Sequence, residues 1–282
     1  LSFTATPNLR QMFRRRTFGF NRLIDTGLHV RDTVILPKLT LSYKVDPAVM
    51  LYFNASEGYE PGRFTLFNET PLLPYKPEKA LNLELGAKGQ TDGGLLSYEV
   101  AAFYIKNKNR QLETLVIDDT GVPNEAIGNV GNARTWGAEF SFTLTPTRGL
   151  ALSANGGWMK SNFTAGDFDG LRVPYAPRFS GGASIDYSAD LSSSLKLSLR
   201  TDIVHNSGFF WNAPNSLRQE SYDIVGARAA IGAVDDSWEI ALRADNLFNE
   251  KYHSELQPFD EENLLARRGQ PRLVVATGTV RF

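Results

Sequence analysis

Apolar and polar residues alternate along most of this chain, and this alternation constrains the fold more than any other feature of the sequence. Apolar side chains take every second position from Leu81 to Ala87, and the stretch from Trp238 to Asp245 repeats the pattern. A period of two residues places the two sets on opposite faces of a β-strand. Helical stripes with a period near 3.6 residues are hard to find. The sequence therefore predicts an all-β protein whose strands each have one apolar and one polar face.

The connections between these runs alternate between short and long. The short ones carry turn residues and lie at Asp46-Pro47, Thr91–Gly94, Pro146–Gly149, Ser188–Ser193 and Val234–Ser237. The long ones are polar and cover 58–78, 118–126, 161–175, 207–218 and 248–270. An up-and-down meander with tight turns at one end and long loops at the other has this pattern.

Strand length separates a membrane barrel from a soluble fold. Several runs alternate for about ten residues, and the run from Leu95 continues to Ile117. Soluble strands average roughly five or six residues, whereas transmembrane strands need roughly nine to eleven. Aromatic residues near the expected strand ends are typical of an interfacial girdle: Tyr43, Tyr52, Phe53, Tyr98, Phe103, Tyr104, Trp158, Tyr187 and Trp238. The pattern favours an antiparallel up-and-down transmembrane β-barrel.

A soluble β-sandwich or propeller is the alternative fold, because alternation alone does not separate a lumen from solvent. A soluble chain of this length is expected to bury some strands on both faces, which produces continuous apolar runs. The nearest such run is Leu273–Ala276.

Composition argues against several functional classes. The net charge of −1 gives no global electrostatic attraction to nucleic acid. The chain has no cysteine, and its histidines, His29, His205 and His253, are far apart. The segment Asp167–Gly170 has part of a calcium-loop pattern without the full set of ligands. We therefore expect no catalytic residue, no metal site and no cofactor.

The chain ends on an amphipathic run whose last residue is Phe282. A terminal aromatic residue on such a strand resembles the assembly signal of outer-membrane β-barrel proteins, which implies recognition by the barrel assembly machinery. The alternative is an ordinary edge strand that ends on a hydrophobic residue.

A motif near the C-terminus points to one family. The residues Asn246, Leu247, Phe248 and Asn249, followed by Lys251 and Tyr252, resemble the C-terminal signature of TonB-dependent outer-membrane receptors. Further segments match in the same order: Tyr59–Gly62, Tyr75–Glu78 with Leu83–Gly86, Ala101–Tyr104, Asn129–Arg134 with Gly137–Glu139, and Gly269–Arg272. The likeness extends over roughly 37–282.

The resemblance implies a function and a location. It implies a receptor in the outer membrane of a Gram-negative bacterium, in contact with outer-membrane lipid. Its cargo would be a scarce, bulky nutrient, usually a ferric siderophore, with cobalamin, haem or saccharides as alternatives. The TonB–ExbB–ExbD complex would drive its active transport through an N-terminal region.

The family has a plug domain inside a barrel of 22 strands, whereas this chain shows about eleven or twelve strands and no plug. We therefore expect the C-terminal portion of a larger barrel. Residues 1–36 are predicted to hold the end of a preceding strand and an extracellular loop, and 37–282 the barrel portion.

Candidate cargo contacts lie in the long loops. Aromatic and cationic groups together suit an anionic chelate with aromatic donors. These residues are Arg63, Phe64, Phe67, Tyr75, Phe209, Phe210, Trp211, Arg218, Arg267 and Arg268. Charges expected on the lumen wall need partners or water, so they are predicted to form a paired wall: Glu84, Lys88, Glu139, Arg200 and Arg243.

Two other functions fit the same strand pattern. A passive porin would conduct ions steadily in a planar bilayer and would need no plug. A soluble β-rich domain for binding or adhesion would stay in solution without detergent.

Overall fold

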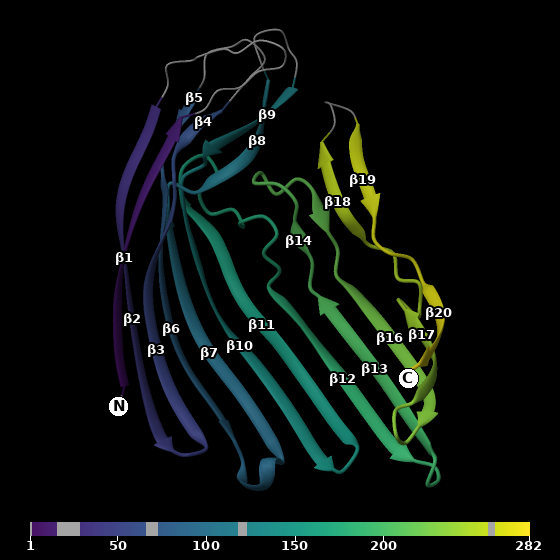
Figure 1. The fold of residues 1–282 in the computed structure, drawn as a ribbon. Coiled ribbons are helices and arrows are strands. Elements are labelled where there is room, and N and C mark those ends of the chain that lie inside the picture. Colours follow the sequence, from purple (N-terminus) through teal and green to yellow (C-terminus); the bar gives the residue numbers. More distant parts are fainter. Residues whose placement is uncertain (1, 16–28, 66–72, 118–122, 259–262) are drawn as a thin grey trace.

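Twelve strands form one antiparallel sheet in the computed structural model, and each strand pairs with its neighbours along the meander (Figure 1). The structure describes residues 2–15, 29–65, 73–117, 123–258 and 263–282. The sheet strands, in order, are β1 Ser2–Arg15, β2 His29–Asp46, β3 Val49–Glu60, β6 Glu78–Gln90, β7 Leu96–Lys108, β10 Asn132–Thr147, β11 Leu150–Ala165, β12 Phe179–Asp190, β13 Leu195–Asn206, β16 Tyr222–Ala233, β17 Trp238–Asp245 and β20 Leu273–Val280. The predicted all-β meander of eleven or twelve strands is confirmed.

Short hairpins stand in four of the long connections, at the end of the sheet opposite the tight turns (Figure 1). They are β4 Arg63–Thr65 with β5 Leu73–Tyr75, β8 Gln111–Ile117 with β9 Pro123–Asn129, β14 Phe209–Phe210 with β15 Arg218–Gln219, and β18 His253–Pro258 with β19 Leu264–Arg268. One tight turn contains a short 3-10 helix, η1 Asp92–Gly94. No helix among the described residues is long and apolar enough to cross a membrane.

The prediction of one long strand from Leu95 to Ile117 is wrong. Strand β7 ends at Lys108, and Asn109 adopts a left-handed backbone with φ 54°. The chain then leaves the sheet and pairs with itself in the β8–β9 hairpin. Alternation continues through both strands, so the residue pattern alone did not mark the break.

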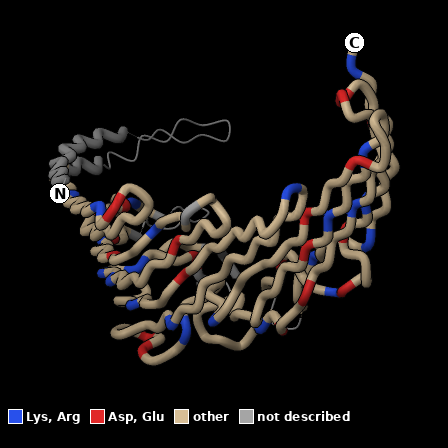
Figure 2. Tube along the Cα trace, turned by 90° about the horizontal axis from the view of Figure 1, so that it is seen from below, with Lys and Arg blue, Asp and Glu red and all other residues tan. Residues whose placement is uncertain are grey.

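The sheet does not close on itself. Strands β1 and β20 form its two edges, and within the described residues neither edge has a second partner. Seen from below, the sheet is a curved trough (Figure 2). Strand β1 and the first residues of β2 lie inside 1–36, where the sequence predicts a strand end and a loop.

Strand register sorts the side chains into two faces. Tyr52, Gly86, Ala101 and Glu139 share one row across four strands, because directly paired residues point to the same side. This polar face is concave, since Glu139 and its neighbours line a hollow of about 550 Å³. The other face is apolar and open.

Large hydrophobic side chains on the apolar face are exposed. Leu85 is 62% exposed, and Ile240 and Val280 are each 64% exposed. A fully buried aliphatic side chain gains about 1.5–3 kcal/mol relative to one in water, so a continuous exposed face of this kind is costly in water. Contact with lipid removes that cost, which agrees with the membrane-barrel prediction.

Candidate functional site

The long connections pack against the loop end of the concave face. Val130, Ala133, Phe163, Val173 and Ala213 form one buried apolar cluster there, and Phe163 is only 1% exposed. Ala133 and Phe163 belong to β10 and β11, whereas the other three belong to connections. The connections are therefore fixed to the barrel wall by packing.

Five side chains from two of these connections form a second group, called here the mouth cluster. It consists of Arg172, Tyr175, Phe209, Phe210 and Trp211. The Phe209 and Trp211 rings are 4.8 Å apart between centroids, and Tyr175 meets Trp211 edge-on at 5.6 Å. The Arg172 guanidinium lies 5.4 Å from the Phe210 ring centroid, within range of a cation–π interaction.

Backbone hydrogen bonds hold the two connections in this arrangement. The Tyr175 amide donates to the Phe210 carbonyl at 2.9 Å. The Asn215 side chain both donates to the Arg172 carbonyl and accepts from the Arg172 amide, each at 2.9 Å. Asn215 and Tyr175 are left-handed, with φ 60° and 58°. The mouth cluster is therefore a built feature of the fold.

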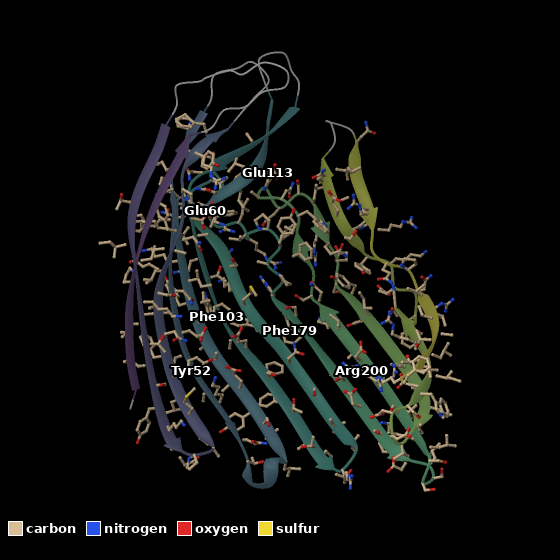
Figure 3. All side chains as sticks on the ribbon, in the orientation of Figure 1. Tyr52, Glu60, Phe103, Glu113, Phe179 and Arg200 are labelled. Atoms are coloured by element: carbon tan, nitrogen blue, oxygen red, sulfur yellow. The ribbon has the colours of Figure 1, made fainter. Side chains whose placement is uncertain are left out.

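Charges of both signs surround the mouth cluster. Burial lowers the pKa of Arg172, and the nearby positive charges of Arg178 and Arg218 lower it further. Tyr175 is 63% exposed, but partial desolvation of its hydroxyl raises its pKa, and the carboxylates of Glu113 and Glu255 add to that shift. Figure 3 places Glu113 at the loop end, far from Tyr52 and Arg200 on the strands. Arginines and carboxylates of the surrounding connections thus both act on the cluster.

The residues predicted to contact cargo fall on three separate hairpins. Phe209, Phe210 and Trp211 meet in the mouth cluster, and Arg218 pairs with Phe210 across β14 and β15. Arg63 lies opposite Tyr75, and Phe64 opposite Pro74, in the β4–β5 hairpin. Arg267 and Arg268 lie on β19, where all residues are exposed. Phe67 lies outside the described residues.

Three of these arginines already form ion pairs. Arg63 pairs with Glu60 at 3.4 Å, Arg218 with Glu220 at 3.4 Å, and Arg267 with Glu255 at 3.3 Å. Exposed pairs of this length are worth little and exchange readily with another anion.

Sequence reasoning missed Arg172 and Tyr175. The segment Leu171–Tyr175 has the same mixture of cation and aromatic ring as the predicted loops. The sequence does not show which other loop this segment contacts, because the contacts join residues more than thirty positions apart. The hydrogen bond from Asn215 to the Arg172 carbonyl is one example.

Two of the matched motifs have structural roles at the base of the hairpins. Buried Glu78 accepts from Arg110 and Asn107, each at 2.7 Å, and from the Gln111 amide at 2.8 Å. Asn129 exchanges hydrogen bonds with the backbone of Lys76 at 2.6 and 3.0 Å. These bonds tie the β8–β9 hairpin to the strands beside it.

The C-terminal signature closes the last long connection. Asn246 is 3% exposed, and its amide group donates to the carbonyls of Glu250 and Gln270, each at 2.9 Å. Asn249 accepts from the Arg272 amide at 3.1 Å, and the Tyr252 ring stacks on Tyr222 at 4.7 Å. Leu247 joins β16 through a bond from its amide to the Val225 carbonyl.

The remaining signature and terminal side chains lie outside this packing. Phe248 is 75% exposed, Lys251 is exposed, and Phe282 follows β20 with its ring exposed. The role of Phe282 as an assembly signal stays a prediction.

The predicted pairing of wall charges is confirmed for three residues. Arg200 binds Asp186 at 2.8 Å, Arg243 binds Asp245 at 3.0 Å, and Glu84 accepts from Asn54 at 3.1 Å. Lys88 and Glu139 instead line hollows of the concave face, which are open to water. Within the described ranges, no three His, Cys, Asp or Glu residues gather to hold a metal ion.

Comparison with known families decides the identity. A family model described as TonB dependent receptor-like, beta-barrel, matches residues 2–247. The chain belongs to the TonB-dependent receptors. These are outer-membrane proteins of Gram-negative bacteria, and they are receptors and transporters rather than enzymes. The resemblance inferred from the motifs is confirmed.

Individual TonB-dependent receptors are similar at low identity. The pesticin receptor of Yersinia pestis is 26% identical over 228 residues, which cover 79% of this chain and 32% of that receptor. The metal-pseudopaline receptor of Pseudomonas aeruginosa is 22% identical over 284 residues, which cover 97% of this chain and 37% of that receptor. The chain therefore spans about a third of the length of these relatives.

Solved structures share the fold. The ferric yersiniabactin uptake receptor of Yersinia pestis superposes with a TM-score of 0.79 at 23% identity, over 90% of this chain and 38% of that one. The ferric citrate transporter gives a TM-score of 0.67 at 24% identity, over 90% of this chain and 39% of that one. The twelve-stranded sheet thus corresponds to a part of a receptor barrel.

Proposed function

We propose that the receptor containing this chain takes up a ferric siderophore across the outer membrane by TonB-coupled active transport. The mouth cluster carries this proposal, because it sets aromatic rings and a cation at the loop end of the polar concave face. Similar structures named as a ferric yersiniabactin uptake receptor and a ferric citrate transporter support an iron chelate as cargo.

The chemistry of capture follows from the cluster. A ferric chelate with aromatic donors offers flat rings and negative charge. Tyr175, which is 63% exposed, and Phe209 supply ring surface, and the buried Trp211 packs against both rings. Arg172 and Arg218 supply positive charge. Arg63, Arg267 and Arg268 on the neighbouring hairpins add cations that would draw the chelate toward the mouth. The barrel performs no covalent step, and TonB–ExbB–ExbD would supply the energy through a region N-terminal to the barrel.

Uptake of radioactive iron tests the proposal. Cells that depend on this receptor are given ⁵⁵Fe bound to phenolate, catecholate, hydroxamate or citrate carriers, with and without an intact TonB system. One carrier is expected to be taken up only when both the receptor and TonB are present. Steady ion conductance of the purified receptor in a planar bilayer, without TonB-dependent uptake, would instead establish the passive porin.

A chelate of a metal other than iron is the second candidate cargo. The similarity to a metal-pseudopaline receptor over 97% of this chain favours it. The same uptake assay, with ⁶⁵Zn or ⁶³Ni bound to the carrier, separates the two candidate cargoes. Competition for uptake between the iron complex and the other metal complex reveals which of them the mouth cluster binds.

A further inference from the structure

Five basic residues stand together on the otherwise apolar outer face of the sheet. This basic patch consists of Lys79, Lys106, Lys108, Arg134 and Lys160, all of them exposed. Register places them on neighbouring strands β6, β7, β10 and β11: Lys79 lies opposite Lys108, Lys106 opposite Arg134, and Lys160 opposite Trp136. Directly paired residues share a face, so all five point away from the lumen.

The five cations of the basic patch outnumber the carboxylates on the same face in the described part of the chain. Like charges directly opposite one another destabilise a sheet, and the patch contains two such pairs. None of its five residues forms an ion pair with a described carboxylate. Glu57 of β3 is the one carboxylate on the apolar face of strands β3, β6, β7, β10 and β11. A net positive surface of this kind attracts anions.

The patch lies at a defined level of the barrel. All five residues are near the strand ends that lead into the long connections. Tyr104 and Trp136 share a row with Lys160, and the Trp136 and Trp158 rings meet edge-on at 5.1 Å. Tyr and Trp on a lipid-facing surface sit at the level of the headgroups. On the tight-turn side of these rings, the apolar faces of the four strands have no charged residue.

We propose that the basic patch binds the phosphate groups of an anionic lipid on the loop side of the membrane. Four neighbouring strands at a spacing of about 4.8 Å give a patch roughly 14 Å wide, the scale of one phosphorylated headgroup. Arg134 offers a planar fork for a phosphate, and the lysines act as flexible point charges whose stems lie along apolar surface. The uncharged apolar rows on the tight-turn side of these rings contact the acyl chains of the same lipid.

Lipid titration of the full receptor, in neutral detergent and followed by native mass spectrometry, tests the proposal. The probes are phosphatidic acid and phosphatidylcholine with the same acyl chains. The wild type is expected to bind phosphatidic acid more tightly. The triple variant Lys106→Gln, Arg134→Gln and Lys160→Gln is expected to reduce that preference on the order of a hundredfold, since each cation near an anionic lipid strengthens attachment about fivefold.

A matched variant controls for total charge. Lys38→Gln, Lys44→Gln and Lys88→Gln remove three exposed cations from the polar face of the same sheet and are expected to leave the lipid preference unchanged. An equal loss in both triple variants, or no loss in the patch variant, overturns the proposal. So does displacement of the lipid by equimolar inorganic phosphate, because the patch would then be a site for soluble anions.

A charge-preserving variant separates binding from folding. Lys106→Arg, Arg134→Lys and Lys160→Arg keep the charge and are expected to retain the preference for phosphatidic acid within about threefold. If the glutamine triple does not fold, Lys106→Gln alone is expected to lower the preference about fivefold, and an unchanged preference in that variant overturns the proposal. Circular dichroism of the β-sheet signal establishes folding in each case.

Discussion

Asn246 shows how one buried side chain fixes the path of the last connection. Its backbone is left-handed with φ 48°, a conformation that Asn tolerates better than most residues. Its side chain makes three hydrogen bonds to backbone groups of Glu250 and Gln270. Because Asn246 supplies both the turn and its hydrogen bonds, no other residue type replaces it fully.

Replacement of Asn246 by alanine is expected to destabilise the receptor. Buried backbone groups that lose their partners cost about 1–3 kcal/mol, and an alanine held in a left-handed conformation adds about 1 kcal/mol. The change is measured as the shift in the urea midpoint of unfolding in lipid vesicles. Phe248→Ala, at an exposed position two residues later, is the control and is expected to stay within about 0.5 kcal/mol of wild type. Equal stability of Asn246→Ala and the control would contradict this role.

Arg172 supplies the positive charge of the mouth cluster. Arg172→Gln removes the cation above Phe210 while keeping much of the side-chain volume. Cargo binding is expected to weaken about tenfold, because a partly buried cation near an anion or ring contributes about 1–2 kcal/mol. The measurement is equilibrium binding of the transported chelate to purified receptor. Arg148→Gln, in an exposed tight turn at the other end of the barrel, is the matched control; an equal loss there would place the effect outside the mouth.

Single strands of this sheet have one face for lipid and one for water. Leu85 and Asn82 belong to the same strand, β6, and point to opposite faces. A charge introduced at Leu85 and a charge introduced at Asn82 are expected to differ in their effect on stability only when lipid is present, because both positions tolerate a charge in water.

An arginine is therefore expected to act differently on the two faces of β6. Leu85→Arg is expected to destabilise the barrel in bilayers by about 2–4 kcal/mol, whereas Asn82→Arg on the water-facing side is expected to change it little. Unfolding in lipid vesicles measures both variants. A soluble β-domain would show no dependence on the face, and that outcome would contradict the membrane orientation of the strand.

The stability of the tight turn between β16 and β17 is expected to depend on pH. The hydrogen bond and positive charge of Lys196 hold the pKa of Asp236 below its ordinary value, and hydrogen bonds from Ser237 lower the pKa of Asp235. A lowered folded-state pKa means that the turn is stabilised above the unfolded pKa of about 4, and that this contribution is lost as pH falls through the folded pKa.

Asp236→Asn is expected to remove part of that pH dependence. Between pH 6 and pH 3 the wild-type unfolding midpoint should decline more steeply than that of the variant, and the two should converge at the acidic end. Asp169→Asn, at an exposed position in a connection away from Lys196, is the comparison. Parallel pH profiles for wild type and Asp236→Asn would show that the Lys196–Asp236 pair contributes nothing to stability.

The whole sheet has two edges, formed by β1 and β20. Unpaired backbone groups along a strand edge pair readily with another chain. The chain of residues 1–282, refolded alone in detergent, is therefore expected to form oligomers whose size rises with concentration, as measured by light scattering after size exclusion. A monodisperse monomer would mean that β1 and β20 pair and close the sheet into a barrel of their own.

Much of this protein followed from local patterns in the sequence. The period of two residues predicted that sheet strands such as β2, β6, β10, β13 and β17 would have opposite apolar and polar faces, because side-chain direction in a strand depends only on position parity. Apart from β8, the short hairpin strands lie largely in segments that the sequence predicted only as long polar connections. The alternation of short and long connections determined the meander, and the order of short motifs identified the family.

Only the tertiary structure decided which side chains meet. Arg172 and Tyr175 join Phe209 and Trp211 because packing against Phe163 and the bonds of Asn215 bring two distant connections together. The basic patch likewise exists only once register aligns Lys79 with Lys108 and Lys106 with Arg134. Local periodicity fixes the face of each residue, whereas register and loop packing depend on contacts between distant parts of the chain, which no local pattern encodes.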